Sequence, residues 1–314
     1  MVFKKVFILI LSIVSSTYLF FFSGFFSLNL NSVQSESLVF ATKIYLVSTS
    51  ICFLTGELTK NYSQIDKIWS IIPIVYVWYF TVQSDYDSRM FLMSTLVSLW
   101  GVRLTLNFAR RGGYSMYFWR GEEDYRWKIL RKKNPWLKPQ LNWSLFNLFF
   151  ICFYQMGLIF LFTLPILAAW TGSNEISFFD YLIGFLMLLF IILETISDQQ
   201  QYDFQTTKYE KIKSKSELTG DYKKGFLTSG LWSYSRHPNF TCEQLIWIIF
   251  YLFSISATGE ILNWSIAGCI LLVILFYNSA KFSEEISAAK YPKYKEYQMN
   301  VPMFLGRFKS NWKD

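Results

Sequence analysis

The feature that most constrains this chain is the length of its apolar blocks. Hydrophobic residues make up 53% of the 314 residues, and they gather in long uninterrupted blocks. A helix needs about 20 apolar residues to cross the hydrocarbon layer of a bilayer. We therefore predict an all-α fold, a polytopic bundle of eight membrane-spanning helices, with seven as the alternative. The predicted spans are residues 6–27, 38–56, 67–83, 89–108, 144–169, 178–197, 240–257 and 262–280.

Lysine and arginine predict the orientation, because they accumulate in short cytosolic loops. With both termini placed in the cytosol, almost all 30 basic residues fall in cytosolic segments. Arg89 is the single basic residue in the predicted outer loops, and Lys43 and Arg103 lie within spans. Removing a middle span would place a basic block outside, so the charge pattern favours eight spans over seven.

The same pattern limits what else the chain does. Basic loops over an anionic leaflet account for the net charge of +8, so no nucleic acid is needed as a partner. The apolar N-terminal segment is longer than that of a signal peptide and lacks a small-residue cleavage site, which favours a retained first span. All four cysteines, which are Cys52, Cys152, Cys242 and Cys269, lie in apolar segments, and we expect buried thiols without disulfides.

Charged residues inside spans are costly and mark functional sites. Arg103 could extend to the membrane interface, or it could face inward and grip a phosphate or carboxylate with its fork of donors. Glu194 and Asp198 are one helical turn apart near the end of their span, where acids run against the helix dipole. We interpret them as a polar site inside the bundle. Asp66 is either an ordinary acid at the cytosolic edge or part of a site.

The stretch GLWSYSRHPNF contains the only histidine of the chain, His237. Arg236, His237 and Asn239 supply donors that suit a dinucleotide, and Glu243 follows one turn into the next span. A single histidine excludes HExxH zinc sites and iron sites with two histidines, so we predict no metal. The chain has no GxGxxG or Walker motif, so any nucleotide would be bound by a membrane site of another kind.

The C-terminal tail repeats tyrosine every three residues, at Tyr291, Tyr294 and Tyr297. Pro292 interrupts the repeat early and predicts that a helix begins there. Glu284 and Glu285 precede this tail and are equally well explained as a solvated helix segment or as part of a site.

These motifs together resemble a known family. GLWSYSRHPNF, ETISDQQQYDFQ and EDYRW are similar to the membrane reductases related to steroid 5-alpha-reductase, in particular their DUF1295 branch. The tail KYPKYKEYQMNVPMF resembles a signature that this branch shares with sterol C14-reductases and with isoprenylcysteine and phospholipid methyltransferases. The likeness covers about residues 60–310. It divides the chain into N-terminal spans, 1–58, and a reductase-like domain, 59–314, with cytosolic loops 109–143 and 198–239 and the tail 281–314.

The resemblance implies a helix bundle that admits NADPH from the cytosol and a lipid or 3-oxo-steroid from the bilayer. Hydride would pass to the β carbon of a conjugated carbon–carbon double bond while a donor polarises the carbonyl oxygen. By position in the motifs, the resemblance implies catalytic roles for Asp66 and Glu243. The residues expected to bind the cofactor are Arg103, Glu194, Asp198, Arg236, His237, Asn239, Tyr291 and Tyr294.

Two alternatives remain beside the reductase. The branch usually continues RHPNYFGE, whereas this chain reads RHPNFTCE, with Phe240 for a tyrosine and Cys242 for a glycine. This departure favours a non-catalytic membrane subunit of a larger complex. The shared tail signature leaves a methyltransferase that uses S-adenosylmethionine. The family default predicts the endoplasmic reticulum membrane, with the mitochondrial inner membrane as the alternative.

Overall fold

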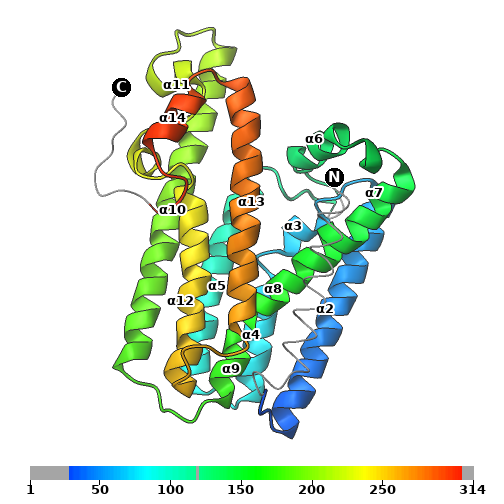
Figure 1. Cartoon of the computed structure of the whole chain (residues 1–314), viewed down its shortest axis with the longest axis vertical. Coiled ribbons are helices and arrows are strands. Elements are labelled where there is room, and N and C mark those ends of the chain that lie inside the picture. Colours follow the sequence, from blue (N-terminus) through cyan, green and yellow to red (C-terminus); the bar gives the residue numbers. More distant parts are fainter. Residues whose placement is uncertain (1–27, 118–119, 306–314) are drawn as a thin grey trace.

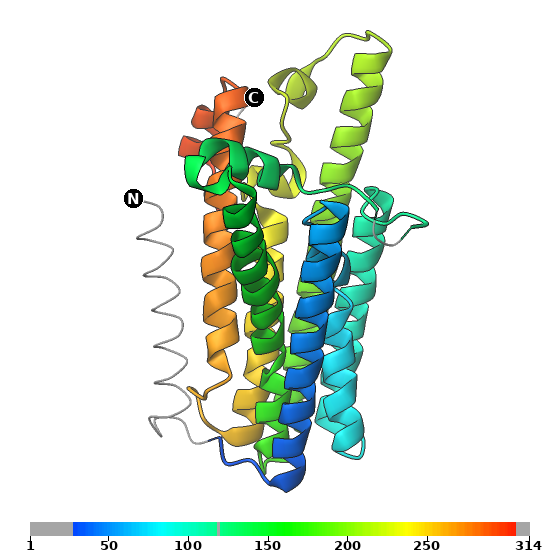
Figure 2. The same cartoon turned by 90° about the vertical axis from the view of Figure 1, so that its right-hand side faces the viewer.

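The computed structural model describes residues 28–117 and 120–305, and these residues form a bundle of helices without strands (Figures 1 and 2). Within this part of the chain, six helical segments are long and apolar enough to cross a membrane. They are α2 (Ser32–Thr59), α5 (Ser88–Arg110), the run Gln140–Thr171, α10 (Phe178–Lys213), α12 (Pro238–Thr258) and α13 (Ile266–Lys290). The predicted all-α membrane bundle is confirmed. The predicted span 6–27 lies outside the described residues, and the number of eight spans stays a prediction.

The predicted span 67–83 is wrong as a single helix. The structure divides it into α3 (Gln64–Ile68) and α4 (Ile72–Gln83), with a tight turn in which the Ile71 N–H donates to the Ile68 carbonyl at 3.0 Å. Pro73 lies in the first turn of α4, where its missing N–H and fixed φ suit a helix start rather than a helix interior. The 12 residues of α4 are too few to cross a bilayer alone.

The run Gln140–Thr171 corresponds to the predicted span 144–169 but changes direction and winding. It consists of α7 (Gln140–Phe146), a π-helical segment η2 (Asn147–Tyr154), α8 (Gln155–Thr163) and α9 (Pro165–Thr171). Pro165 begins α9, since proline fits the first position of a helix and not its interior. The run crosses the bundle obliquely between α2 and α13 (Figure 1).

Glycines allow two close helix approaches. A Cβ on Gly101 of α5 would lie 2.5 Å from the Ser70 carbonyl oxygen, and one on Gly268 of α13 would lie 2.3 Å from the Leu161 carbonyl carbon. Both positions therefore require glycine. Small residues at such crossings let membrane helices pack by dispersion contacts, which matter where lipid is as apolar as the protein.

Two helices continue well past their predicted ends. Instead of stopping at 197 and 280, α10 reaches Lys213 and α13 reaches Lys290, so residues 198–213 are helical rather than a loop (Figure 2). The short helices α11 (Gly220–Lys224), η3 (Gly230–Ser233) and α14 (Tyr294–Asn300) lie at the same end (Figure 1). α6 (Tyr125–Lys133) and η1 (Pro135–Leu137) lie to one side of it. We call this end, where α5, α10 and α13 finish in basic residues, the basic end.

Candidate functional site

Five of the predicted site residues meet in one place, which we call the Arg103 cluster: Arg103, Glu194, Asp198, Asn239 and Glu243. Each of three helices contributes residues four positions apart, Arg103 and Asn107 on α5, Glu194 and Asp198 on α10, and Asn239 and Glu243 on α12. Residues at this spacing share a helix face, so each helix presents one polar patch to the other two.

Asp198 is the most heavily bonded acid of the cluster. Its Oδ2 accepts hydrogen bonds from Arg103 Nη1 at 2.9 Å and from Asn107 Nδ2 at 2.8 Å. Its Oδ1 accepts from Asn239 Nδ2 at 3.3 Å and lies 3.6 Å from Arg111 Nη2. Four donor groups thus surround this carboxylate.

Glu243 is held by two tryptophans that were not predicted as site residues. Its Oε2 accepts from Trp100 Nε1 at 2.8 Å, and its Oε1 accepts from Trp247 Nε1 at 3.1 Å. The two indole rings pack edge to face with centroids 4.9 Å apart, and Phe162 covers Trp247 at 4.1 Å. Aromatic rings thus surround the carboxylate.

Glu194 is bonded less completely. Its Oε2 forms an ion pair with Arg103 Nη2 at 2.7 Å, and no other donor lies at hydrogen-bond distance from it among the described residues. The same nitrogen lies 3.9 Å from Glu243 Oε2. Other buried polar atoms on the same helices make no hydrogen bond within the described residues: Arg103 Nε, Ser197 Oγ, Gln201 Oε1 and Asn239 Oδ1.

Arg236 and His237 lie in a separate group, the Glu284 cluster, with Glu284 and Gln298. Glu284 Oε1 accepts from Arg236 Nε at 2.7 Å and lies 2.9 Å from His237 Nε2, while Oε2 accepts from Gln298 Nε2 at 2.7 Å. Arg236 Nη1 also donates to the carbonyls of Gln298 and Val301. These side chains fasten α12, α13 and the tail to one another, so the predicted nucleotide donors are already paired within the protein.

The tail tyrosines pack against this second cluster and not against the first. Tyr294 is buried with its ring centroid 5.0 Å from that of Phe226, and Tyr291 lies 5.7 Å from the same ring. Burial raises the pKa of the Tyr294 hydroxyl above its usual range. The structure shows both residues in packing roles at the basic end.

Asp66 lies apart from both clusters, on the short helix α3. The loop 120–124 is fastened beside it, because Asp124 N–H donates to Ser63 Oγ at 3.0 Å and Lys67 Nζ donates to the Arg120 carbonyl at 2.8 Å. Burial under this loop raises the pKa of the Asp66 carboxyl to about 6, and nearby Asp124 acts in the same direction.

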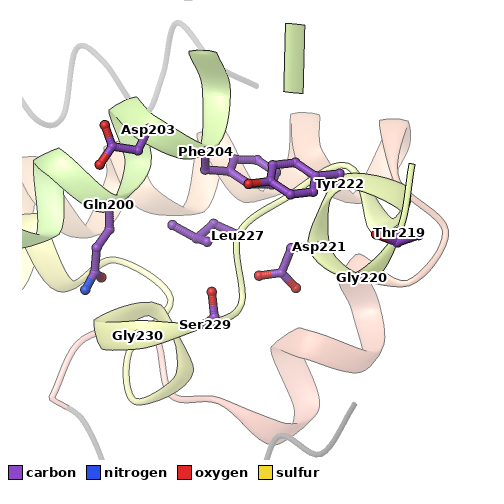
Figure 3. A pocket seen from close by; sticks show the side chains of 10 residues that line it. All are labelled: Gln200, Asp203, Phe204, Thr219, Gly220, Asp221, Tyr222, Leu227, Ser229 and Gly230. Carbon is purple, nitrogen blue, oxygen red and sulfur yellow. The ribbon is translucent and has the colours of Figure 1, made fainter. Parts of the chain in front are cut away.

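A pocket of about 520 Å³ opens at the basic end, starting less than one turn beyond Asp198 on α10 (Figure 3). Gln200, Phe204 and Tyr222 form part of its wall, with the two rings nearly parallel. Its charged lining residues are the acids Asp203 and Asp221. This lining suits hydroxyl and amide groups better than phosphate.

The four cysteines are free and buried. Among the described residues, no group of three or more histidine, cysteine, aspartate or glutamate side chains could hold a metal ion. The absence of a metal stays a prediction.

Several residues of these clusters were missed in the sequence. Asn107 and Trp247 each lie four positions from a predicted site residue, so helical spacing contained a signal for them. Trp100, Arg111 and the pairing of Glu284 had no local signal, since their partners come from other helices.

Two comparisons with known proteins found matches. The model of the family described as "Protein of unknown function (DUF1295)" matches residues 52–301. The chain is 34% identical over 319 residues to the fission yeast (Schizosaccharomyces pombe) protein named "Uncharacterized protein C594.04c", covering 95% of this chain and 90% of the relative. No solved structure matches significantly.

Proposed function

The chain belongs to the DUF1295 family, and from that premise we propose that it reduces a conjugated carbon–carbon double bond in a lipid or 3-oxo-steroid-like substrate with NADPH. The observation that carries the proposal is that buried polar atoms around Arg103, among them Arg103 Nε and Asn239 Oδ1, make no hydrogen bond within the described part of the chain. Buried donors and acceptors are normally paired, and those left unpaired require a reason such as ligand binding. A polar ligand reaching between α5, α10 and α12 would satisfy them.

The donor set of the cluster fits a nicotinamide dinucleotide in part. A carboxamide offers one acceptor and two donors, and the cluster offers guanidinium and amide donors beside carboxylate acceptors. Arg111 has a side chain that is 43% exposed at the edge of the cluster, where it could meet phosphate oxygens. The dinucleotide would supply the hydride, and the residues of the chain would bind and orient it.

A lipid substrate is supported by a second, apolar pocket of about 360 Å³ between α2, α8 and α13. Leu38, Tyr45 and Leu271 are among its lining residues, and α8 separates it from Trp247 through Phe160 and Phe162. A flat apolar molecule from the bilayer fits the lining of this pocket.

The decisive experiment is a titration of the purified full-length protein in detergent. Trp100 and Trp247 lie at the cluster, so bound NADPH should quench tryptophan fluorescence by energy transfer. Oxidation of NADPH is then followed in the presence of a 3-oxo-4-ene steroid. Saturable quenching with steroid-dependent oxidation supports the reductase.

The pairing of Arg236 and His237 with Glu284 favours a second candidate, a non-catalytic membrane subunit that keeps the fold. It predicts no quenching by NADPH and no oxidation. Quenching by S-adenosylmethionine instead would support a methyltransferase and contradict both.

A further inference from the structure

The charges of the Arg103 cluster do not balance if all three acids are ionised. Glu194, Asp198 and Glu243 all lie within 4 Å of Arg103, and the second guanidinium that reaches the group, Arg111, contacts Asp198. Two cations thus face three carboxyl groups among apolar helices. An uncompensated charge in a membrane interior is costly, so the cluster is neutral when one carboxyl group carries a proton.

The hydrogen bonds indicate which acid that is. Asp198 accepts from Arg103, Asn107 and Asn239, and Glu243 accepts from two indole N–H groups. Donated hydrogen bonds stabilise a carboxylate in its charged form. Glu194 has a single donor, Arg103 Nη2 at 2.7 Å, and its side chain is only 5% exposed. Glu194 is therefore the acid on which a proton costs least.

Unpaired polar atoms continue from Glu194 toward the basic end. Ser197 Oγ and Gln201 Oε1 are buried and make no hydrogen bond within the part of the chain that the structure describes. They follow Glu194 by three and seven positions, so the three side chains lie on one face of α10. At about 1.5 Å of rise per residue, Gln201 lies roughly 10 Å nearer the basic end.

We propose that Glu194 holds the proton that the reduction delivers to the substrate, and that Ser197 and Gln201 lead its replacement in from the basic end. This rests on the proposed function. In the reaction the β carbon of the enone gains a hydride from the reduced nicotinamide dinucleotide, and the π electrons move to the carbonyl oxygen. The α carbon of that enolate then takes the proton of Glu194, which becomes a carboxylate until a proton from water replaces it. One dinucleotide and one proton are consumed for each double bond.

The test is infrared spectroscopy of the full-length protein in detergent at pH 8, without substrate. A protonated carboxyl group has a C=O stretching band that is separate from carboxylate bands and shifts in D₂O. At pH 8 Asp66 is ionised and does not contribute. We expect one such band in the wild type, its loss in Glu194→Gln, and its retention in the matched control Asp180→Asn, an acid paired one to one with Arg89.

A spectrum without this band at pH 8 would overturn the proposal, as would a band that persists in Glu194→Gln or disappears only in Glu243→Gln. If Glu194→Gln fails to fold, the band must shift with ¹³C-carboxyl glutamate and not with labelled aspartate, and it must persist in Glu243→Gln. Ser197→Ala should keep the band and slow its hydrogen–deuterium exchange at least tenfold, and an unchanged rate would exclude the route along α10.

Kinetics separate this inference from the proposed function. In Glu194→Gln, turnover at saturating NADPH should fall by roughly 10² or more, the usual contribution of a general acid. Equal turnover of the two proteins would overturn the role in the reaction. If the wild type shows the band but neither binds nor oxidises NADPH, the proposed function fails and the proton site stands.

Discussion

The two ends of the bundle each bury an arginine against acids, and the two arginines are paired in opposite ways. At the end away from the basic end, Arg89 Nε donates to Asp180 Oδ1 at 2.8 Å, and its two Nη atoms donate to the carbonyls of Asn174 and Glu175. Asp180 also accepts from Ser177 N–H at 2.8 Å, at the start of α10. One cation meets one acid, and the guanidinium has a partner on every nitrogen.

Arg103 has the opposite balance, with three acids around it and an Nε that makes no hydrogen bond among the described residues. Both sites pair a buried arginine with buried carboxyl groups, so residue type and burial do not distinguish them. The difference lies in the unpaired atoms: a satisfied pair fixes two segments, whereas an unsatisfied cluster retains capacity for a ligand or a proton. Stability and function should therefore respond differently at the two ends.

The largest effect is expected at the Arg89 pair. Arg89→Met leaves Asp180 as an uncompensated buried charge, which costs about 3–5 kcal/mol of folding stability. The change is measured by thermal unfolding in detergent. The double variant Arg89→Met with Asp180→Leu removes both charges and should recover most of the loss. If Arg89→Met alone were as stable as the wild type, the proposed contrast between the two ends of the bundle would be wrong.

Arg103→Lys tests whether the Arg103 cluster serves ligand binding rather than stability. Lysine keeps the charge but loses the planar fork, so NADPH binding should weaken 10- to 100-fold, about 1.4–2.7 kcal/mol. Stability should change by less than about 1 kcal/mol, because the charge is kept. Fluorescence titration and thermal unfolding give the two values. A large stability loss with unchanged affinity would make Arg103 a structural residue like Arg89.

Asp66 is an intermediate case, because burial raises its pKa and neighbouring cations compensate its negative charge only in part. Its pKa in the folded protein, about 6, exceeds the ordinary value of 3.8, so folding favours its protonated form. Stability from this group is then present at low pH and is lost as the pH rises from 3.8 to 6. Because the half-buried carboxyl is reached by water, we expect Asp66→Asn to gain about 1–2 kcal/mol at pH 8.

The measurement is the difference in unfolding between Asp66→Asn and the wild type at pH 8 and at pH 5. The difference in stability should shrink at pH 5. Comparing the two proteins at both pH values cancels the contributions of the other carboxyl groups to stability. A gain that is the same at both values would show that the effect is packing and not ionisation.

The sequence predicted the Arg103 cluster well because its signals are local. Glu194 and Asp198 are one turn apart on one helix, and charge patterning placed Arg103 at the same membrane side. Three helices that each carry a polar patch at one level bring those patches together. The apolar blocks predicted the spans for a similar reason, since length and hydropathy are properties of single segments.

The sequence could not show which acid pairs with which base. Arg236 and Glu284 are 48 residues apart, and their meeting depends on how α13 passes α12 and continues beyond its apolar part. The break between α3 and α4 was also not predicted from the sequence, because residues 67–83 keep an apolar composition through the turn. Hydropathy predicts burial in a membrane, whereas the turn is fixed by Pro73 and by the close approach of Gly101.

The smallest effect is expected at Phe240, where the chain departs from the family string. Its ring packs edge-on against Phe276 at 4.8 Å and nearly parallel to His237 at 5.4 Å, on the side of the Glu284 cluster. Because these contacts use the ring, Phe240→Tyr should change NADPH affinity less than threefold, below about 0.7 kcal/mol. Cys242→Gly serves as the matched control and should cost about 1 kcal/mol of stability, as glycine does inside a helix. A tenfold gain in affinity with Phe240→Tyr would mean that the missing hydroxyl limits binding, and that the Glu284 cluster belongs to the cofactor site after all.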